Sequence, residues 1–234
     1  MPQYVNKERY NTQDLIEIVK LLRAPDGCPW DKVQTHESIR GNVLEEAYEV
    51  ADAIDNSDDD ALLEETGDLL LQVVFHGVMA EEREAFNYDD IADAICKKLL
   101  FRHPHVFGDV TANNEQQALS TWENMKKKEK SQVTVSDTLN SVPKAFPSLL
   151  RASKVLKRAD KSDEVKISLL DEEQLVNNIL SLKDKPQNAE KMIGDVLLKL
   201  VALARENDVD SEQALEKAVN NYISEFEKSE NKGV

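Results

Sequence analysis

The segment spanning residues 59–83 constrains the fold of this 234-residue chain more than any other part of the sequence. Drawn as an α-helix, it has one polar stripe about 80° wide, formed by Glu65, Asp68, Gln72 and His76. Apolar side chains occupy almost all of the remaining circumference, and a helix that is apolar nearly all round is buried. Because buried carboxylates without partners are very costly, the segment predicts a functional polar cluster inside a helical bundle.

Helical signals also dominate the rest of the chain. It has only seven glycines and seven prolines, and long segments show a 3.6-residue periodicity. Thr12 and Asn87 are the predicted N-caps of the first and fourth helices, with Asp90 completing the second cap. A linker is expected over 131–147, and no strand is predicted. The expected helices span about 13–24, 37–55, 59–83, 88–102, 114–130, 148–160, 171–205 (with a break near Lys185 and Pro186) and 210–228.

A second group of acidic residues lies on the helix that precedes this segment. Glu45, Glu46 and Glu49 share one side of it, away from its apolar stripe. Neither helix supplies a Lys or Arg near the acidic residues, whereas Mg²⁺ is satisfied by carboxylates, water and phosphate oxygens. A carboxylate di-iron site is the rival, but it needs Glu-x-x-His pairs on two helices, and His76 stands alone outside that spacing.

Lys98 and Arg102 are i, i+4 neighbours near the end of the fourth helix. Two interpretations remain open for this pair. Cations are favourable at a helix C-terminus in any protein. Beside a magnesium cluster, the same pair would serve as a phosphate clamp.

Composition restricts the class of partner. The chain has 45 acidic and 29 basic residues and a net charge of -16, so its long-range field disfavours nucleic acid and anionic membranes. No apolar run approaches the roughly 20 residues of a membrane span, and the start of the chain resembles neither a signal nor a transit peptide. Cys28 and Cys96 are too few for a disulfide framework. We therefore expect a cytoplasmic protein with reduced thiols.

Four stretches of the sequence resemble the MazG-type nucleoside triphosphate pyrophosphohydrolases: CPWDKVQTHESIR, LEEAYEVADAI, EETGDLLLQVVFH and KKLLFRHPHVFGDV. The resemblance is dense from residue 13 to about 130 and looser beyond. It implies an all-α fold, a homodimer or higher homo-oligomer, and Mg²⁺ dependence, with Mn²⁺ as the alternative ion. It also implies hydrolysis of a nucleoside triphosphate to monophosphate and pyrophosphate. The family's Glu-Glu-x-x-Glu and Glu-x-x-Asp signature matches Glu45, Glu46, Glu49, Glu65 and Asp68 in full.

The resemblance also suggests roles for individual residues. It implies metal ligation by Glu46, Glu49, Glu65 and Asp68, with Glu45 as a neighbouring acid for water or a second metal. Substrate binding is implied for the phosphate-binding pair Lys98 and Arg102, for Trp122 near the nucleotide, and for Lys126. Trp30, Lys32 and His36 lie in a further motif, for which packing of a capping loop is the alternative explanation.

An internal repeat divides the chain. Residues 67–74 read GDLLLQVV and residues 194–201 read GDVLLKLV. We predict two tandem MazG-like helical-bundle repeats, a catalytic one over 1–130 and a degenerate one over 148–234, joined by the linker. In the second repeat, Asn177, Asn178 and Ser181 align with the three glutamates of the first helix, Met192 and Asp195 with the Glu-x-x-Asp pair, and Asn221 and Glu225 with the cationic pair.

Three functional hypotheses follow from the sequence. The first is the metal-dependent hydrolase, whose sequence lacks the G-x-x-x-x-G-K-[ST] loop used by many enzymes that attack the γ-phosphorus. The second is a non-catalytic nucleotide-sensing or protein-binding helical module, in which damage to the acidic or cationic groups would be expected, and none is seen. The third is an acidic structural adaptor, which would leave the polar stripe open to water.

Overall fold

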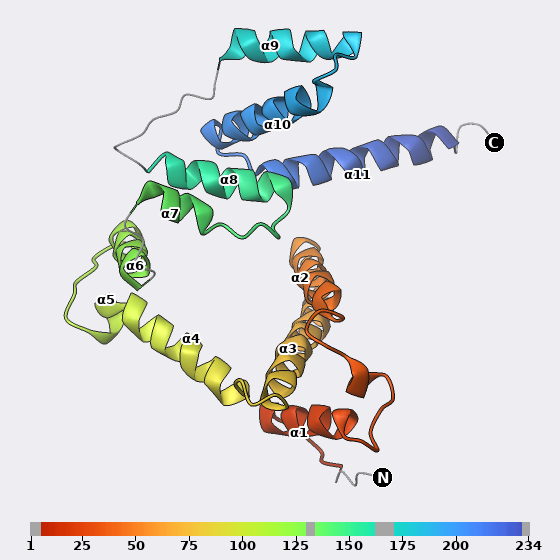
Figure 1. Cartoon of the computed structure of the whole chain (residues 1–234), viewed down its shortest axis with the longest axis vertical. Coiled ribbons are helices and arrows are strands. Elements are labelled where there is room, and N and C mark those ends of the chain that lie inside the picture. The colour runs from red at the N-terminus through yellow and green to blue at the C-terminus, as the bar shows by residue number, and fades with distance from the viewer. Residues whose placement is uncertain (1–5, 130–133, 162–170, 231–234) are drawn as a thin grey trace. The chain divides into compact units, whose positions relative to one another are not determined.

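The computed structural model describes residues 6–129, 134–161 and 171–230. Within these ranges every regular element is a helix (Figure 1), which confirms the all-α prediction. The chain divides into two compact units, Met1–Glu123 and Asn124–Val234. No helix in the described ranges is long and apolar enough to cross a membrane, and both Cys28 and Cys96 are free.

The helices of the first unit agree with the sequence periodicity. Asn87 caps α4 in a reciprocal capping box with Asp90, as predicted. The expected cap at Thr12 is wrong, because Asn11 accepts from the Asp14 N–H while the Asp14 carboxylate accepts from the Asn11 N–H. The helices are α1 Thr12–Arg23, α2 Arg40–Asp55, α3 Asp59–Glu81, α4 Tyr88–Arg102, α5 Pro104–Phe107 and α6 Glu115–Glu129, with a 3₁₀ turn over Asp31–Val33.

The core of the first unit lies where α1 and the start of α2 meet the C-terminal half of α3. Its buried residues are Ile16, Val19, Ile39, Val74, Phe75, Val78 and Met79. Burying one such side chain stabilises the fold by roughly 1.5–3 kcal/mol. The N-terminal half of α3 is different, since Leu63 is 75% exposed and Leu70 and Val73 are also exposed. The prediction that this helix is buried along its whole length is therefore wrong for the single chain.

Arg23 fastens the segment between α1 and α2. Its guanidinium donates to the backbone oxygens of Asp31 (2.6 Å) and Gln34 (3.2 Å). It also donates two hydrogen bonds, of 2.8 and 2.7 Å, to the Glu82 carboxylate. The Arg23 side chain thus connects α1 to the segment between α1 and α2 and to the C-terminal end of α3. These contacts position the segment that leads into α2.

The second unit is built from α7 Val135–Asn140, α8 Ser148–Ala159, α9 Glu172–Ser181, α10 Ala189–Glu206 and α11 Ser211–Glu230. The break predicted near Lys185 is confirmed, and Lys185 itself has a positive φ of 49°. The stretch expected as a linker contains α7, because Thr134 and Asp137 form a capping box. Its residues 131–133 lie outside the described part of the chain. Buried side chains from α8, α9 and α10 include Leu156, Leu175, Val196 and Val201.

Candidate active site

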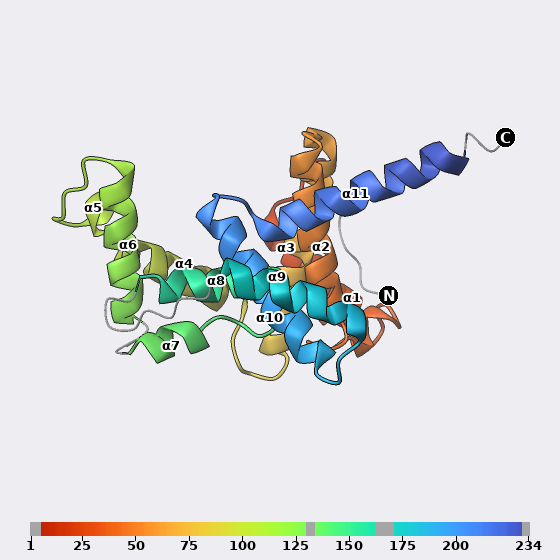
Figure 2. The ribbon, with the colours of Figure 1, turned by 90° about the horizontal axis from the view of Figure 1, so that it is seen from above.

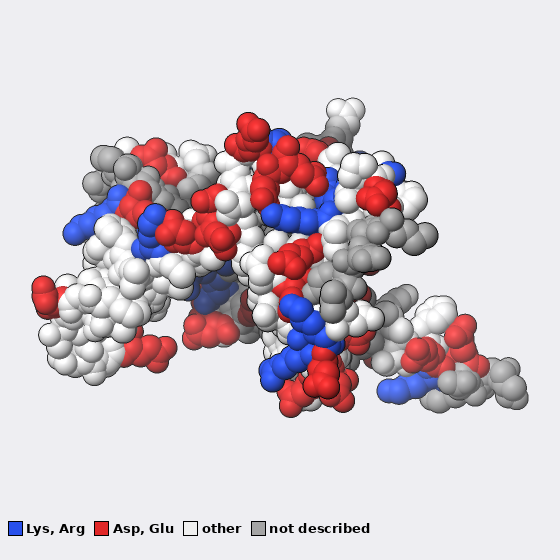
Figure 3. Space-filling view, turned by 90° about the horizontal axis from the view of Figure 1, so that it is seen from below, with Lys and Arg blue, Asp and Glu red and all other residues white. Residues whose placement is uncertain are grey.

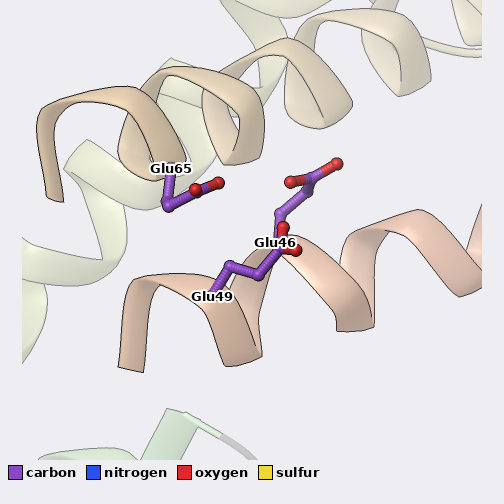
Figure 4. A group of neighbouring side chains, drawn as sticks. All are labelled: Glu46, Glu49 and Glu65. Atoms are coloured by element: carbon purple, nitrogen blue, oxygen red, sulfur yellow. The ribbon is translucent and has the colours of Figure 1, made fainter. Parts of the chain in front are cut away.

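Three glutamates meet on the α2–α3 pair. Glu46 and Glu49 lie on α2, and Glu65 faces them from α3 (Figure 4). One carboxylate oxygen from each lies within 4.8 Å of the other two. Views from two directions show α2 and α3 side by side (Figures 1 and 2), and their packing sets the spacing of the three side chains.

The surroundings of this cluster disfavour its negative charge. Burial raises the pKa of Glu46 above its usual value, and a hydrogen bond with Glu49 and the charge of Asp68 raise it further. Burial also raises the pKa of Glu65, followed by the charges of Glu49, Glu64 and Asp68. None of the three glutamates has an ion pair with Lys or Arg among the described residues.

Asp68 and Glu45 border the cluster without joining its closest group. Asp68 is half-buried on α3, three residues after Glu65, and its charge acts on both Glu46 and Glu65. Glu45 is exposed on α2, and its charge acts on Glu46. All five acidic residues of the predicted signature therefore lie in one neighbourhood. It is more open to water than the helical pattern indicated, since Glu45 and Glu49 are exposed.

Gln72 is a neighbour that the sequence placed on the polar stripe but gave no role. Its side chain is buried, and its Nε2 approaches Glu46 Oε1 at 3.5 Å. Its Oε1 is buried and has no hydrogen-bond partner among the residues that the structure describes. An acceptor in this state, beside a carboxylate cluster, suits a site that a cation or its bound water completes.

The donors of the cluster suit a hard divalent cation. All are carboxylate oxygens, which Mg²⁺ and Mn²⁺ prefer over nitrogen or sulfur ligands. The raised pKa values of Glu46 and Glu65 come first from burial and then from the neighbouring negative groups, which no cation compensates among the described residues. A bound divalent ion would remove that repulsion and favour the ionised glutamates. The residues present therefore fit such an ion.

The predicted substrate-binding residues form a second group. Lys98 and Arg102 lie one turn apart on α4, and the Arg102 guanidinium stacks over the Trp122 ring at 5.4 Å to its centroid. Lys126 follows Trp122 by one turn on α6 and is half-buried. The structure thus brings these four side chains to α4 and α6. Within the first unit, the C-terminal end of α4 lies apart from α2 (Figure 1).

The loop before α2 contains the other predicted residues. Trp30 is exposed, so its ring is not packed into the loop, whereas Lys32 Nζ donates to the Pro25 carbonyl of the same loop at 3.2 Å. His36 reaches α3 instead, where its Nδ1 lies 2.7 Å from Nδ1 of His76. Burial, followed by the charge of His36, lowers the pKa of His76. His76 therefore has His36 as a partner in the structure. Its spacing in the sequence had indicated no partner for it.

The charge excess alone would not have located the site. On the face drawn in Figure 3, acidic side chains occur in several separate groups, with Lys and Arg between them. Acidic groups on a solvated surface are common in a chain with a net charge of -16. What distinguishes the α2–α3 cluster is convergence from two helices, the raised pKa values and the orphaned Gln72 oxygen.

Known proteins resemble this chain over most of its length. The family model described as MazG nucleotide pyrophosphohydrolase domain matches residues 34–107, which include the five acidic residues and the cationic pair. The nucleoside triphosphate pyrophosphohydrolase/pyrophosphatase MazG of Thermotoga maritima is 38% identical over 224 residues, covering 93% of this chain and 85% of its own. The nucleoside triphosphate pyrophosphohydrolase of Escherichia coli (strain K12) is 38% identical over 232 residues, covering 92% and 86%. That of Mycobacterium tuberculosis is 40% identical over 151 residues, covering 64% and 45%.

Proposed function

Because this chain belongs to the MazG family of nucleotide pyrophosphohydrolases, we propose that it hydrolyses nucleoside triphosphates to nucleoside monophosphate and pyrophosphate. The observation that supports this most directly is the convergence of Glu46, Glu49 and Glu65 within 4.8 Å. These residues lie inside the matched family segment and have no cationic partner among the described side chains. The names of the relatives indicate the same reaction.

Mg²⁺ is the proposed cofactor, with Mn²⁺ as the alternative, and Glu46, Glu49, Glu65 and Asp68 would hold it. When bound, such an ion neutralises phosphate charge and lowers the pKa of a coordinated water. The chain's own groups supply the rest of the chemistry. Glu45 is exposed beside Glu46 and is our candidate for accepting the proton of the attacking water.

The cationic group would bind the triphosphate and the base. Lys98 and Arg102, one turn apart, are about 6 Å apart along the helix axis, a spacing that suits two successive phosphates. Trp122 already stacks with Arg102 and offers a flat apolar ring to a base. Lys126 adds a further positive charge on the same face of α6. Trp30 and Lys32 belong to the loop before α2 and remain secondary candidates for substrate contact.

We infer that a second copy of the chain completes each site. Within the first unit, the C-terminal end of α4, which carries Lys98 and Arg102, lies apart from α2, which carries Glu46 and Glu49 (Figure 1). Exposed apolar side chains flank both groups and would be covered in a homodimer. They include Leu63, Leu70 and Val73 on α3, and Leu99, Leu100 and Phe101 on α4.

Mixing two inactive variants tests this assembly. Glu65→Gln damages the acidic group, and Arg102→Gln damages the cationic group. If the groups of one site come from different chains, a mixed dimer has one intact site and one doubly damaged site. An equal mixture should then recover about a quarter of wild-type activity, because half of randomly paired dimers are mixed. Activity that stays at the level of the separate variants would show that each chain builds its own site.

Isotope labelling tests the reaction itself. The chain is incubated with a panel of nucleoside triphosphates in ¹⁸O-labelled water, with Mg²⁺ or with EDTA. We expect metal-dependent turnover with the label in the monophosphate, which reports attack at the α-phosphorus. Labelled inorganic phosphate as the first product would contradict the proposal. Tight nucleotide binding without any turnover would favour the nucleotide-sensing module instead.

We further propose that the catalytic repeat occupies residues 1–130 and that residues 148–234 form a degenerate repeat. In the second repeat, neutral side chains stand at four of the five positions that align with the acidic cluster, and only Asp195 is acidic. An Asp195→Asn variant should therefore keep wild-type activity, whereas Asp68→Asn should remove it at saturating Mg²⁺. Equal losses of activity in the two variants would contradict the proposal that only the first repeat is catalytic.

A further inference from the structure

A pocket of about 360 Å³ lies between α9 and α10 of the second unit. Its polar lining combines two lysines, three amides and one carboxylate. The volume is within the range of small-molecule sites. These polar side chains are Gln174, Asn178, Asn188, Lys191, Asp195 and Lys199.

Lys199 is the unusual member of this lining. Its side chain is only 8% exposed, and its Nζ donates to Gln174 Oε1 at 2.6 Å. It has no ion pair with a carboxylate within the described part of the chain. An ammonium group has three donors, and a buried charge whose partner is neutral is costly. Lys199 is therefore a buried cation that no carboxylate of the described residues pairs with directly, although Asp195 lines the same pocket.

The register of the two repeats makes this pocket the counterpart of the acidic cluster. With the GD pairs aligned, three lining residues fall on positions that form or border the first site, and a fourth, Asn178, does so once a short deletion is allowed before α10. At these positions the first unit has three carboxylates and one amide, whereas the second has one carboxylate, one amide, one thioether and one ammonium. The correspondences are Glu46 with Asn178, Glu65 with Met192, Asp68 with Asp195, and Gln72 with Lys199.

The charge of the site has thus reversed. Lys191 and Lys199 outweigh Asp195, so the lining has a net charge of +1 in a chain whose net charge is -16. One carboxylate beside two ammonium groups does not suit a divalent cation. Ammonium and amide N–H groups together suit a ligand with several acceptor oxygens and at least two negative charges.

We propose that the α9–α10 pocket binds a small phosphate-bearing anion directly, without a metal ion. Lys199 supplies the buried charge and Lys191 a second charge, while the amide groups of Gln174, Asn178 and Asn188 donate to further oxygens. A bound anion would supply negative charge next to the buried Lys199 ammonium and so offset the free-energy cost of burying it unpaired. This site stands on the geometry of the second unit, and it does not depend on hydrolysis by the first.

Calorimetric titration of the full chain with inorganic pyrophosphate, in EDTA, measures this binding. We expect one Lys199-dependent site per chain, and Lys199→Met should weaken it about tenfold or more, the effect of losing a charge-assisted bond. Lys217→Met removes an exposed lysine from α11 of the same unit and should leave its affinity unchanged. Arg102→Gln should remove only the additional pyrophosphate binding that the cationic group of the first unit contributes, and the Lys199-dependent site should persist. Loss of binding in Arg102→Gln but not in Lys199→Met would overturn the assignment.

Stability separates a ligand-binding role from a structural one. Because Lys199 is a buried charge that no described carboxylate pairs with directly, Lys199→Met should unfold at an equal or higher urea concentration than the wild type when no anion is present. Pyrophosphate should raise the melting temperature of the wild type and of Lys199→Arg, which keeps the charge, but not that of Lys199→Met. A Lys199→Met variant that is less stable, yet binds pyrophosphate as the wild type does, would show that Lys199 only ties α10 to α9.

A second titration identifies the source of the phosphate. Adenosine monophosphate and inorganic pyrophosphate present the same chemistry, and 360 Å³ accommodates either. Tighter binding of the monophosphate would mean that the pocket also contacts the nucleoside, whereas tighter binding of pyrophosphate would assign it to the free anion. Both results support the site. Equal, weak binding of sulfate and phosphate that Lys199→Met does not change would refute it.

Discussion

The Arg23→Met substitution should lower the free energy of unfolding of the first unit by about 3 kcal/mol. Arg23 is buried, with a side chain only 6% exposed. Methionine keeps most of its length and apolar contact but removes all four hydrogen bonds. Each bond to a backbone carbonyl, at Asp31 and Gln34, contributes roughly 1 kcal/mol or slightly more. The Glu82 carboxylate is partly exposed, so the ion pair adds no more than about 1 kcal/mol.

Lys20→Met is the matched control. Lys20 lies on the same helix and pairs with Glu81 on α3 at 2.7 Å, the same distance as the Arg23–Glu82 contact. Its side chain is 45% exposed, and its Nζ donates to the Glu81 carboxylate rather than to backbone carbonyls. An exposed pair of this kind contributes about 0.5 kcal/mol or less. The two variants therefore remove similar ion pairs and differ in burial and in the backbone carbonyls.

Tryptophan fluorescence during urea unfolding provides the assay. The chain has two tryptophans, and both Trp30 and Trp122 lie in the first unit. Their fluorescence therefore reports that unit without a signal from the second. We expect a lower urea midpoint for Arg23→Met and, in a thermal scan followed by the same fluorescence, a melting temperature about 10 °C lower, with little change in either for Lys20→Met. Equal losses in the two variants, or no loss in Arg23→Met, would refute the reasoning from burial and carbonyl bonding.

Three further predictions follow from other parts of the structure. Glu65→Gln should reduce metal-dependent hydrolysis about 100-fold or more while circular dichroism stays unchanged, whereas Glu64→Gln, an exposed neighbour outside the closest group, should retain activity. The pKa of His76 is lowered by burial and then by His36, so its stabilising contribution is present above the ordinary pKa of about 6.5 and is lost as pH falls through the lower folded value. Urea midpoints of wild type should thus fall between pH 7 and 5 more steeply than those of His76→Phe. Gly194→Ala should stabilise α10 by about 1 kcal/mol in thermal unfolding, since an added Cβ meets nothing within 4 Å.

The sequence predicted the helices well because their signals are local. A 3.6-residue apolar repeat and a capping pair such as Asn87 and Asp90 depend only on neighbours along the chain. The same local signals were overlooked at α7, where a linker was predicted. Its Thr134 and Asp137 belong to a stretch rich in Ser, Thr and Asp that reads as a loop, although these residues also form a capping box.

Contacts between distant positions could not be predicted from periodicity. The His36–His76 pair joins residues that lie 40 positions apart, and the Arg102–Trp122 stack joins α4 to α6. Neither contact leaves a repeat in the sequence. The five acidic residues were found for a different reason. They share polar faces on two consecutive helices, and two helices joined by a short loop pack side by side.

The exposed part of α3 links assembly to the chemistry of the site. The exposed residues Leu63, Leu70 and Val73 lie on the same helix as Glu65 and Asp68, close to them along the chain. A surface that covers these apolar side chains would also exclude water from the glutamates and lower the local dielectric, which strengthens both their mutual repulsion and their attraction for a divalent ion. Assembly without the ion would then be opposed by the acidic cluster, and assembly with the ion would be favoured. The half-buried glutamates of the single chain are therefore consistent with a site whose metal affinity and whose oligomeric state depend on each other.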